Sequence, residues 1–168
     1  AIILGCADSR VPPELIFDEG LGDLFVIRDA GNVVDDEVLG SIEYAVEHLG
    51  AHLVVVLGHE QCGAVSAAVA VAAGRADAPG HIKTIVDSIR PSVDETAGQP
   101  GDQVHNCVLA NARRVAKQIR ESDPILKHAV EHNHLIVVAA DYDLETSKVQ
   151  FLDLAEPARK MVSKAAHK

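Results

Sequence analysis

Short apolar runs alternate with helical patterns along this chain. Four runs are rich in β-branched residues and lack the strict alternation of apolar and polar positions that a half-exposed strand shows: residues 1–6, 24–28, 52–57 and 134–140. Strands that are apolar on both faces are typical of a parallel sheet covered by helices on each side. A fifth run, 148–154, follows a polar turn and predicts a final edge strand.

The segments between these runs predict helices. Apolar residues recur at helical spacing from Val38 to Leu49, behind the acidic residues 35–36 and before Gly50 as a stop signal. Further helices are predicted from Cys62 to Gly74, over 81–90, over 104–119 and after Pro124, and the prolines and glycines of residues 75–101 break that segment around its short helix. The alternation of strands and helices predicts an α/β fold, with a mostly parallel central sheet of four strands, an antiparallel edge strand and flanking helices.

Length and charge limit the class of protein. The 168 residues fit a single domain over 1–168, and the formal charge of −10 argues against nucleic acid or an anionic membrane as a partner. The apolar runs are far shorter than the roughly 20 residues that span a bilayer. Because residue 1 is not Met and lies inside an apolar run, we expect the natural product to extend upstream. A cytoplasmic location is expected, with a periplasmic or organellar one left open.

Two short motifs directly follow apolar runs and carry candidate metal ligands. They are CADSR at residues 6–10 and GHEQC at residues 58–62. Because the carboxyl ends of parallel strands meet at one edge of a sheet, Cys6, His59 and Cys62 are expected to converge. Two thiolates and an imidazole favour zinc over magnesium or calcium. Three protein ligands leave a fourth position for water, which is typical of catalytic zinc.

Asp8 and Arg10 lie beside the first predicted ligand and are the candidate catalytic residues. Zinc lowers the pKa of bound water to about 7, so hydroxide is available at neutral pH. Asp8 could instead bind the metal, unless Arg10 holds its carboxylate through two parallel hydrogen bonds. Asp8 held in this way can accept a hydrogen bond from zinc-bound hydroxide and orient it.

Three residues are candidates for the substrate pocket. Gly31 and Asn32 follow the second predicted strand at the edge that carries the metal, where they either line the pocket or only make the turn. Gly63 follows the last ligand and lets the backbone bend tightly around the ion. The third cysteine, Cys107, falls in the middle of a helical face and is predicted to be a packing residue.

Five stretches of this chain, in the same order, resemble β-class carbonic anhydrases: CADSRVPPE, LFVIRDAGN at 24–32, SIEYAVEHLG at 41–50, VVVLGHEQCGAV at 54–65 and DYDLETSKVQFL at 141–152. The resemblance implies reversible hydration of carbon dioxide to bicarbonate and a proton. It implies one Zn²⁺ per chain, bound by Cys6, His59 and Cys62, with Asp8 and Arg10 as the catalytic dyad. It also implies a homodimer or a dimer-based larger oligomer, and a helical arm upstream of residue 1.

The chain departs from the family pattern at several positions, among them Ala139 and Ser147, where the family commonly has Gly. Some members have an inhibitory bicarbonate pocket built from a Trp, an Arg and a Tyr; Arg28 and Tyr44 match it, but Ile3 stands at the Trp position. We therefore predict the permanently open form of the metal site near neutral pH. Asp29 stands where the family usually has Asn, and Glu19 is the nearest candidate for a pocket Gln.

Two other functions stay open at the level of sequence. Carbon disulfide or carbonyl sulfide are linear molecules open to the same attack, so a hydrolase for them is the first alternative. A non-catalytic zinc protein is the second, and it predicts a fourth protein ligand in place of water. The intact pair of Asp8 and Arg10 speaks against the second. The sequence does not single out any other histidine as a proton relay.

Overall fold

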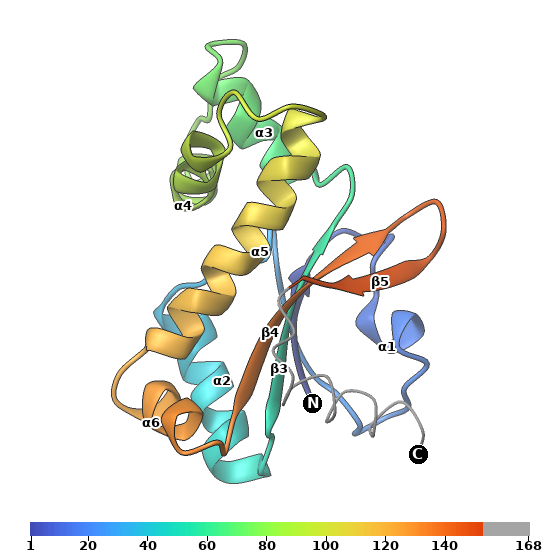
Figure 1. Cartoon of the computed structure of the whole chain (residues 1–168), viewed down its shortest axis with the longest axis vertical. Helices are drawn as coiled ribbons and strands as arrows, with labels where there is room; N and C mark the ends of the chain where they lie inside the picture. The colour runs from blue at the N-terminus through green and yellow to red at the C-terminus, as the bar shows by residue number, and fades with distance from the viewer. Residues whose placement is uncertain (153–168) are drawn as a thin grey trace.

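A computed structural model describes residues 1–152 and places five strands in one sheet (Figure 1). Their order across the sheet is β2-β1-β3-β4-β5; the first four are parallel, and β5 is antiparallel to β4. The α/β prediction is confirmed, and residues 153–154 of the predicted edge strand lie outside the described residues. The strands are β1 (Ile2–Cys6), β2 (Phe25–Asp29), β3 (Leu53–His59), β4 (Ile136–Asp143) and β5 (Lys148–Phe151).

The register of the sheet brings the two metal-ligand motifs to one edge. Cys6 pairs with Asp29 at the end of β1 and β2, and His59 pairs with Tyr142 across β3 and β4. Because β1 and β3 are parallel neighbours, their carboxyl ends lie side by side. A separation of more than 50 residues along the chain thus becomes a short distance in space.

Six helices connect the strands in the described part of the chain. Two caps bound the helix α2: before it, the Asp35 carboxylate accepts the Val38 N–H at 2.8 Å, and after it, Gly50 takes the left-handed conformation of the predicted stop signal. The four-residue helix α1 was not predicted, because one turn shows no periodicity. The helices are α1 (Pro13–Ile16), α2 (Asp36–Leu49), α3 (Gly63–Ala72), α4 (Ile82–Glu95), α5 (Gln103–Glu121) and α6 (Ile125–Glu131).

The predicted end of the helix at residue 90 was wrong. The helix α4 continues through Pro91 to Glu95, although an internal proline removes one backbone hydrogen bond and costs about 3 kcal/mol. Burial compensates for this loss, since Ile89 and Val93 lie on the same buried face on either side of the proline. Arg90 also forms an ion pair with Asp94 at 2.8 Å across it.

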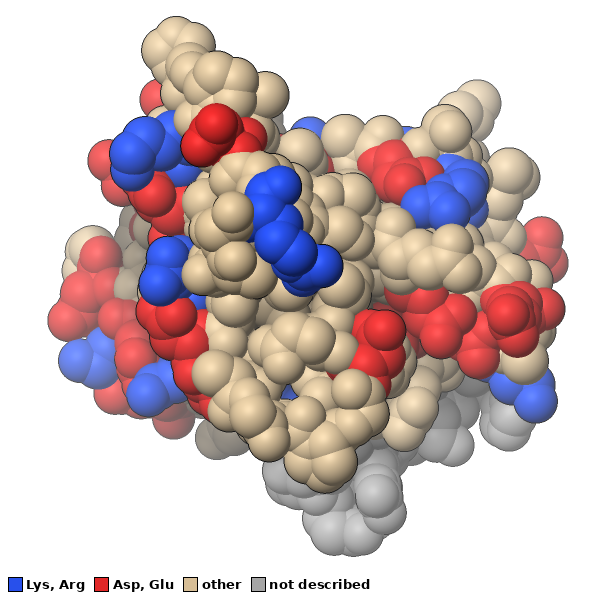
Figure 2. Space-filling model, turned by 90° about the horizontal axis from the view of Figure 1, so that it is seen from above, with Lys and Arg blue, Asp and Glu red and all other residues tan. Residues whose placement is uncertain are grey.

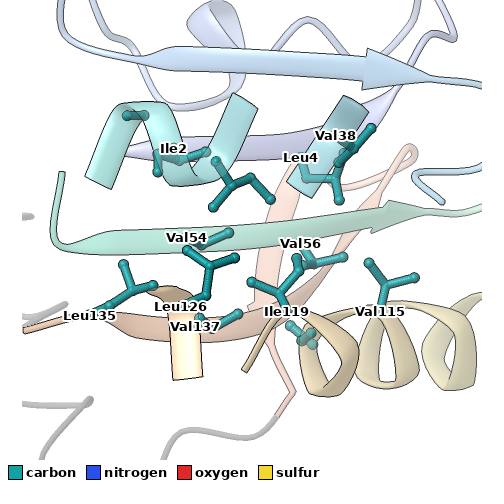
Figure 3. Close-up of a cluster of buried hydrophobic side chains, with 14 of the residues drawn as sticks. Ile2, Leu4, Val38, Val54, Val56, Val115, Ile119, Leu126, Leu135 and Val137 are labelled. Atoms are coloured by element: carbon teal, nitrogen blue, oxygen red, sulfur yellow. The ribbon is translucent and has the colours of Figure 1, made fainter. Parts of the chain in front are cut away.

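The main hydrophobic core lies between the sheet and the helices α2, α5 and α6 (Figure 3). β1 and β3 contribute alternate residues to it, and the helices close it from one side (Figure 1). The labelled core residues are Ile2, Leu4, Val38, Val54, Val56, Val115, Ile119, Leu126, Leu135 and Val137.

The opposite face of the sheet carries a second apolar cluster. Ile3, Val55 and Leu57 point to this face, and Ile16 and Phe17 at the end of α1 pack against them. A third cluster surrounds Cys6 and Cys62 at the carboxyl edge, where α3, α4 and α5 pack together. The metal-ligand motifs are therefore held by packed helices on the side of the sheet that the longest helix covers.

Charged side chains are mixed on the end of the molecule that carries α3 and α4. Figure 2 shows Asp and Glu side chains along both margins of this face, with Lys and Arg side chains scattered between them. Within residues 1–152, no helix has the length and apolar character needed to cross a membrane.

Candidate metal centre

Three buried side chains converge where β1 and β3 end. Cys6 is the last residue of β1, His59 is the last residue of β3, and Cys62 caps the N-terminus of α3. The two sulfur atoms lie 4.0 Å apart, and all three ligand atoms lie within 4.8 Å of one another. In the described part of the chain this is the only such group of three. The structure brings together the three ligands that the sequence predicted.

The geometry fits a tetrahedral metal ion. Two sulfur atoms bonded to one zinc ion at about 2.3 Å lie roughly 3.8 Å apart in a tetrahedron, close to the observed separation. His59 Nδ1 lies 2.8 Å from the Glu60 carbonyl oxygen, which places the ring proton on Nδ1. Nε2 then carries a lone pair, and it is buried with no hydrogen-bond partner among the described residues. A metal ion would satisfy it.

The charges of the two cysteines also call for a cation. The hydrogen bond from Cys62 lowers the pKa of Cys6, and the Gly31 N–H and the Asp8 N–H act in the same direction against burial. The same contact with Cys6, together with burial, raises the pKa of Cys62. Two thiolates at this distance repel each other, so both can be charged only with a cation between them.

The N-terminus of α3 favours a thiolate at Cys62. The backbone N–H groups of Val65 and Ala64 lower the pKa of Cys62, although the larger effects of Cys6 and burial raise it. Helix N-termini stabilise negative charge through these unpaired N–H groups and the helix dipole. Cys107 is fully buried, and burial raises the pKa of its thiol to about 12. A neutral buried thiol agrees with the prediction that Cys107 is a packing residue.

The side chain of Asp8 is held by Arg10 beside the three ligands. Arg10 donates from Nη2 to Asp8 Oδ2 at 2.8 Å and from Nε to Oδ1 at 3.0 Å, and its backbone N–H donates to Oδ1 at 2.9 Å. Arg10 Nη2 also donates to the Gln61 carbonyl oxygen at 3.2 Å, which ties the first motif to the second. These hydrogen bonds hold the pKa of Asp8 far below its usual range. Asp8 is thus an ionised acceptor whose direction is fixed.

Arg28 fixes the backbone of the first motif. Its Nε donates to the Cys6 carbonyl oxygen at 2.9 Å, and its Nη2 donates to the Asp8 carbonyl oxygen at 2.5 Å. Sequence reasoning considered this arginine only as part of a bicarbonate pocket and missed the contact, because it depends on the pairing of β1 with β2. Ile3 is buried within β1, and Tyr44 is half exposed beside His48.

The three predicted pocket residues lie next to the metal ligands. The Gly31 N–H donates to Cys6 Sγ at 3.4 Å, Asn32 is buried beside it, and Gly63 is the first residue of α3. Asn32 Nδ2 has no hydrogen-bond partner within the described residues. Their role as a substrate pocket stays a prediction.

Asn111, which the sequence did not single out, supports this turn from α5. Its Nδ2 donates to the Gly31 carbonyl oxygen at 3.0 Å across 80 residues of sequence. In the sequence it is one polar residue within a helical pattern, so no local signal marks it.

Gly31 is expected to be the position in this turn that tolerates a side chain least. Its φ is +86°, and a Cβ there would lie 2.8 Å from Ile89 Cδ1 and 3.0 Å from Ala64 Cβ. Gly31→Ala should lower the free energy of unfolding by about 2 kcal/mol, through backbone strain and overpacking. Gly40→Ala, at an open position inside α2, should raise it by about 0.5–1 kcal/mol. Urea unfolding of both variants measures this, and equal effects would contradict the packing argument.

Two of the departures from the family pattern lie in different surroundings. Asp29 is partly buried at the end of β2, where its carboxylate accepts the Val33 N–H at 2.9 Å, and burial raises its pKa to about 6. Glu19 is exposed and lines an apolar hollow on the far face of the sheet together with Ile3 and Phe17. Nothing in the structure places Glu19 against the metal ligands.

Asp141, on β4, is a buried acid that sequence reasoning missed. Only 5% of it is exposed, and its Oδ1 has no hydrogen-bond partner among the described residues. Burial raises the pKa of Asp141, and the nearby imidazoles of His105 and His59 oppose this only in part. It lies in a strand that reads as apolar up to Ala140, so its burial follows from the pairing of β4 with β3.

Asp141→Asn is expected to stabilise the protein at neutral pH. Because the folded state holds the Asp141 proton to a higher pH than the unfolded chain does, its ionisation costs folding free energy above the ordinary carboxyl pKa of about 3.9. The free energy of unfolding of the variant should exceed that of the wild type by about 1 kcal/mol at pH 7. The gain should shrink as the pH falls toward 4. Urea unfolding at several pH values measures it, and a gain independent of pH would rule out ionisation as the cause.

The fold and this group of side chains define an α/β protein in which two cysteines and one histidine form a candidate metal site. A family model described as carbonic anhydrase matches residues 1–149. "Carbonic anhydrase 2" of Mycobacterium tuberculosis (strain CDC 1551 / Oshkosh) is 56% identical over 93 residues, which are 55% of this chain and 45% of the relative. The carbonic anhydrase of Pseudomonas aeruginosa is 34% identical over 183 aligned residues, covering 99% of this chain and 78% of the relative.

Solved structures agree with the sequence matches. The β-carbonic anhydrase CafA of Aspergillus fumigatus superimposes with a TM-score of 0.82 at 27% identity, over 98% of this chain and 79% of that one. A β-carbonic anhydrase of Sordaria macrospora, described as tetrameric, superimposes with a TM-score of 0.82 at 25% identity, over 91% of this chain and 80% of that one. The chain therefore belongs to the carbonic anhydrase family, in its β class. The aligned region spans about half the length of the mycobacterial relative.

Proposed function

We propose that this protein catalyses the reversible hydration of carbon dioxide to bicarbonate and a proton, with zinc as its metal. One observation carries the proposal. The buried side chains of Cys6, His59 and Cys62 lie together, and the Nε2 atom of His59 has no hydrogen-bond partner among the described residues. Beside them, Arg10 holds the carboxylate of Asp8. Membership of the carbonic anhydrase family supports the same activity.

Each residue of the centre has a distinct task in this proposal. Cys6, His59 and Cys62 would hold the zinc ion, and this donor set suits zinc better than magnesium or calcium. A bound zinc ion supplies a nucleophile at neutral pH, because it lowers the pKa of water to about 7. Arg28 and the Gly31 N–H keep the Cys6 loop in position for this set.

Asp8 selects and orients the reacting oxygen. Its carboxylate is ionised and accepts three hydrogen bonds from Arg10, which leaves free lone pairs. An ionised carboxylate only accepts, so it favours an oxygen that carries a proton, as water and bicarbonate do. The pairing of Asp8 with Arg10 supports the open form of the site, and the buried Ile3 at the position of the Trp supports the absence of the inhibitory pocket.

We also propose that the functional unit is a homodimer or a dimer-based oligomer. An apolar hollow of about 400 Å³ opens on the sheet face that lies away from α5, lined by Ile3, Phe17 and Val55 among others. Leu15 and Leu21 flank some of the residues that line this hollow in the sequence, and their side chains are exposed, with 80% and 107% of their surface accessible. Exposed large apolar side chains beside an apolar hollow are typical of an interface. Light scattering would give the mass in solution, and a monomer would overturn this part.

A stopped-flow assay of carbon dioxide hydration, with metal analysis of the same sample, tests the proposed function. We expect one zinc ion per chain and hydration that depends on it. Carbon disulfide and carbonyl sulfide are offered to the same sample. Hydrolysis of either without carbon dioxide hydration would assign the scaffold to that chemistry, and zinc without any of the three activities would indicate a non-catalytic protein.

A further inference from the structure

Four histidines gather at the amino ends of the parallel strands, at the end of the sheet opposite the candidate metal centre. His52 directly precedes β3, His134 lies just before β4, His128 is on α6, and His132 caps the C-terminus of that helix. Figure 1 shows α6 beside the beginning of β4, at the end of the sheet away from α3. Seven residues of β3 at about 3.3 Å each separate this group from His59 by roughly 23 Å.

The rings of this histidine cluster are close to one another. The centres of the His128 and His132 rings are 4.0 Å apart and stacked, and the His132 and His134 centres are 6.3 Å apart. His132 Nδ1 lies 2.9 Å from the His128 carbonyl oxygen, and His52 Nδ1 lies 3.0 Å from the His134 carbonyl oxygen. Because each Nδ1 donates its proton to a carbonyl oxygen, the Nε2 lone pairs of His52 and His132 remain available for a ligand.

A hollow of about 590 Å³ lies beside three of these four side chains. His52, His128 and His134 line it together with the carboxylate of Glu47, while Val46 and Ala129 form its apolar part. Neither the core nor the proposed reaction requires imidazoles here. The described histidines outside this cluster and the candidate metal centre, His48, His81 and His105, lie elsewhere in the chain, so the clustering is confined to this end of the sheet.

We infer that the histidine cluster binds one divalent transition-metal ion of the nickel, copper or zinc type, separate from the metal centre. Imidazole nitrogen suits these ions. His132, the C-terminal cap of α6, follows His128 by four residues, and their stacked rings show that both lie on one side of this helix end. Among residues 1–152 only the metal centre has three ligand atoms within 4.8 Å, so the rings of the cluster turn to close on the ion. The three histidines on α6 and after it are exposed and free to do so. His52 or Glu47 then completes the set.

Equilibrium dialysis against Ni²⁺ tests this inference on the full chain with its resident metal. The resident metal is measured in the same samples, so that exchange at the metal centre is told apart from added binding. We expect one additional Ni²⁺ per chain. Because the loss of even an outer-shell partner costs roughly 10–100-fold in metal affinity, His128→Asn with His132→Asn should weaken this binding by at least about tenfold. Carbon dioxide hydration should not change, since the cluster lies far from the metal centre.

A matched double variant controls for nonspecific binding. His48→Asn with His81→Asn removes two exposed histidines from other elements and should leave the added Ni²⁺ binding unchanged. NMR signals of the histidine rings should broaden at His128, His132 and His134 on addition of Ni²⁺. Equal Ni²⁺ binding by the wild type and the His128 and His132 variant would overturn the inference. An equal loss in the control would also overturn it.

Discussion

Cys62→Ser is expected to lose the metal and the activity together. A serine hydroxyl is a hard, protonated oxygen at neutral pH and cannot replace a thiolate, so the remaining Cys6 and His59 would hold zinc only weakly. Carbon dioxide hydration should fall by at least about a thousandfold, because hydroxide is then scarce at neutral pH. Zinc analysis after dialysis and stopped-flow hydration on the same sample measure both losses. A variant with full metal content and activity would remove Cys62 from the centre.

Cys107→Ser is the matched control for this experiment. The same chemical change is made at a fully buried cysteine on α5, which belongs to the same apolar cluster as Cys6 and Cys62 but is not one of the three candidate ligands. The buried hydroxyl should cost about 1–3 kcal/mol of stability, yet zinc content and activity should stay at the level of the wild type. Should both cysteine variants lose zinc, the loss would report general unfolding and not a missing ligand. A urea unfolding curve of each variant separates the two causes.

Asp8→Asn should keep the metal but react slowly. The amide cannot carry the charge that accepts hydrogen bonds from Arg10, and its NH₂ group would face the donors of the guanidinium. The side chain at position 8 then loses its fixed orientation beside the candidate metal centre, and it no longer favours an oxygen that carries a proton. We expect a fall in kcat/KM of about 100-fold or more, in the range of general acid–base and orienting groups. Stopped-flow hydration with zinc analysis measures it, and full activity would take Asp8 out of the mechanism.

Asp94→Asn is the control for the loss of an Asp–Arg ion pair. Asp94 accepts a hydrogen bond from Arg90 Nε at 2.8 Å on the surface of α4, so the chemical change matches while the location differs. Exposed ion pairs contribute about 0–1 kcal/mol to the free energy of unfolding, so the stability and the activity of this variant should stay close to those of the wild type. A fall in activity equal to that of Asp8→Asn would mean that the effect does not depend on the metal centre.

The three candidate metal ligands could be predicted from sequence because their signals are local and because the carboxyl ends of parallel strands generally meet at one end of a sheet. Cys6 and His59 each follow an apolar run, and parallel strands bring such positions to one edge. Asp8 and Arg10 lie two residues apart, so their contact needs only a short loop. The extension of α4 beyond Pro91 could not be found in this way, because the proline is a strong local stop signal and the compensating burial comes from other helices.

Sequence alone determined the order of the strands and of every described helix except α1, the three candidate metal ligands and the charged pair beside them. These follow from periodicity and from residue types at short spacing, both of which act within a few residues. Only the tertiary structure decided how the ligands are held, through Arg28 on β2 and Asn111 on α5, and which histidines form a cluster at the other edge of the sheet. Such contacts join residues far apart in the chain, and burial and hydrogen bonding between packed elements leave no periodic pattern in the sequence.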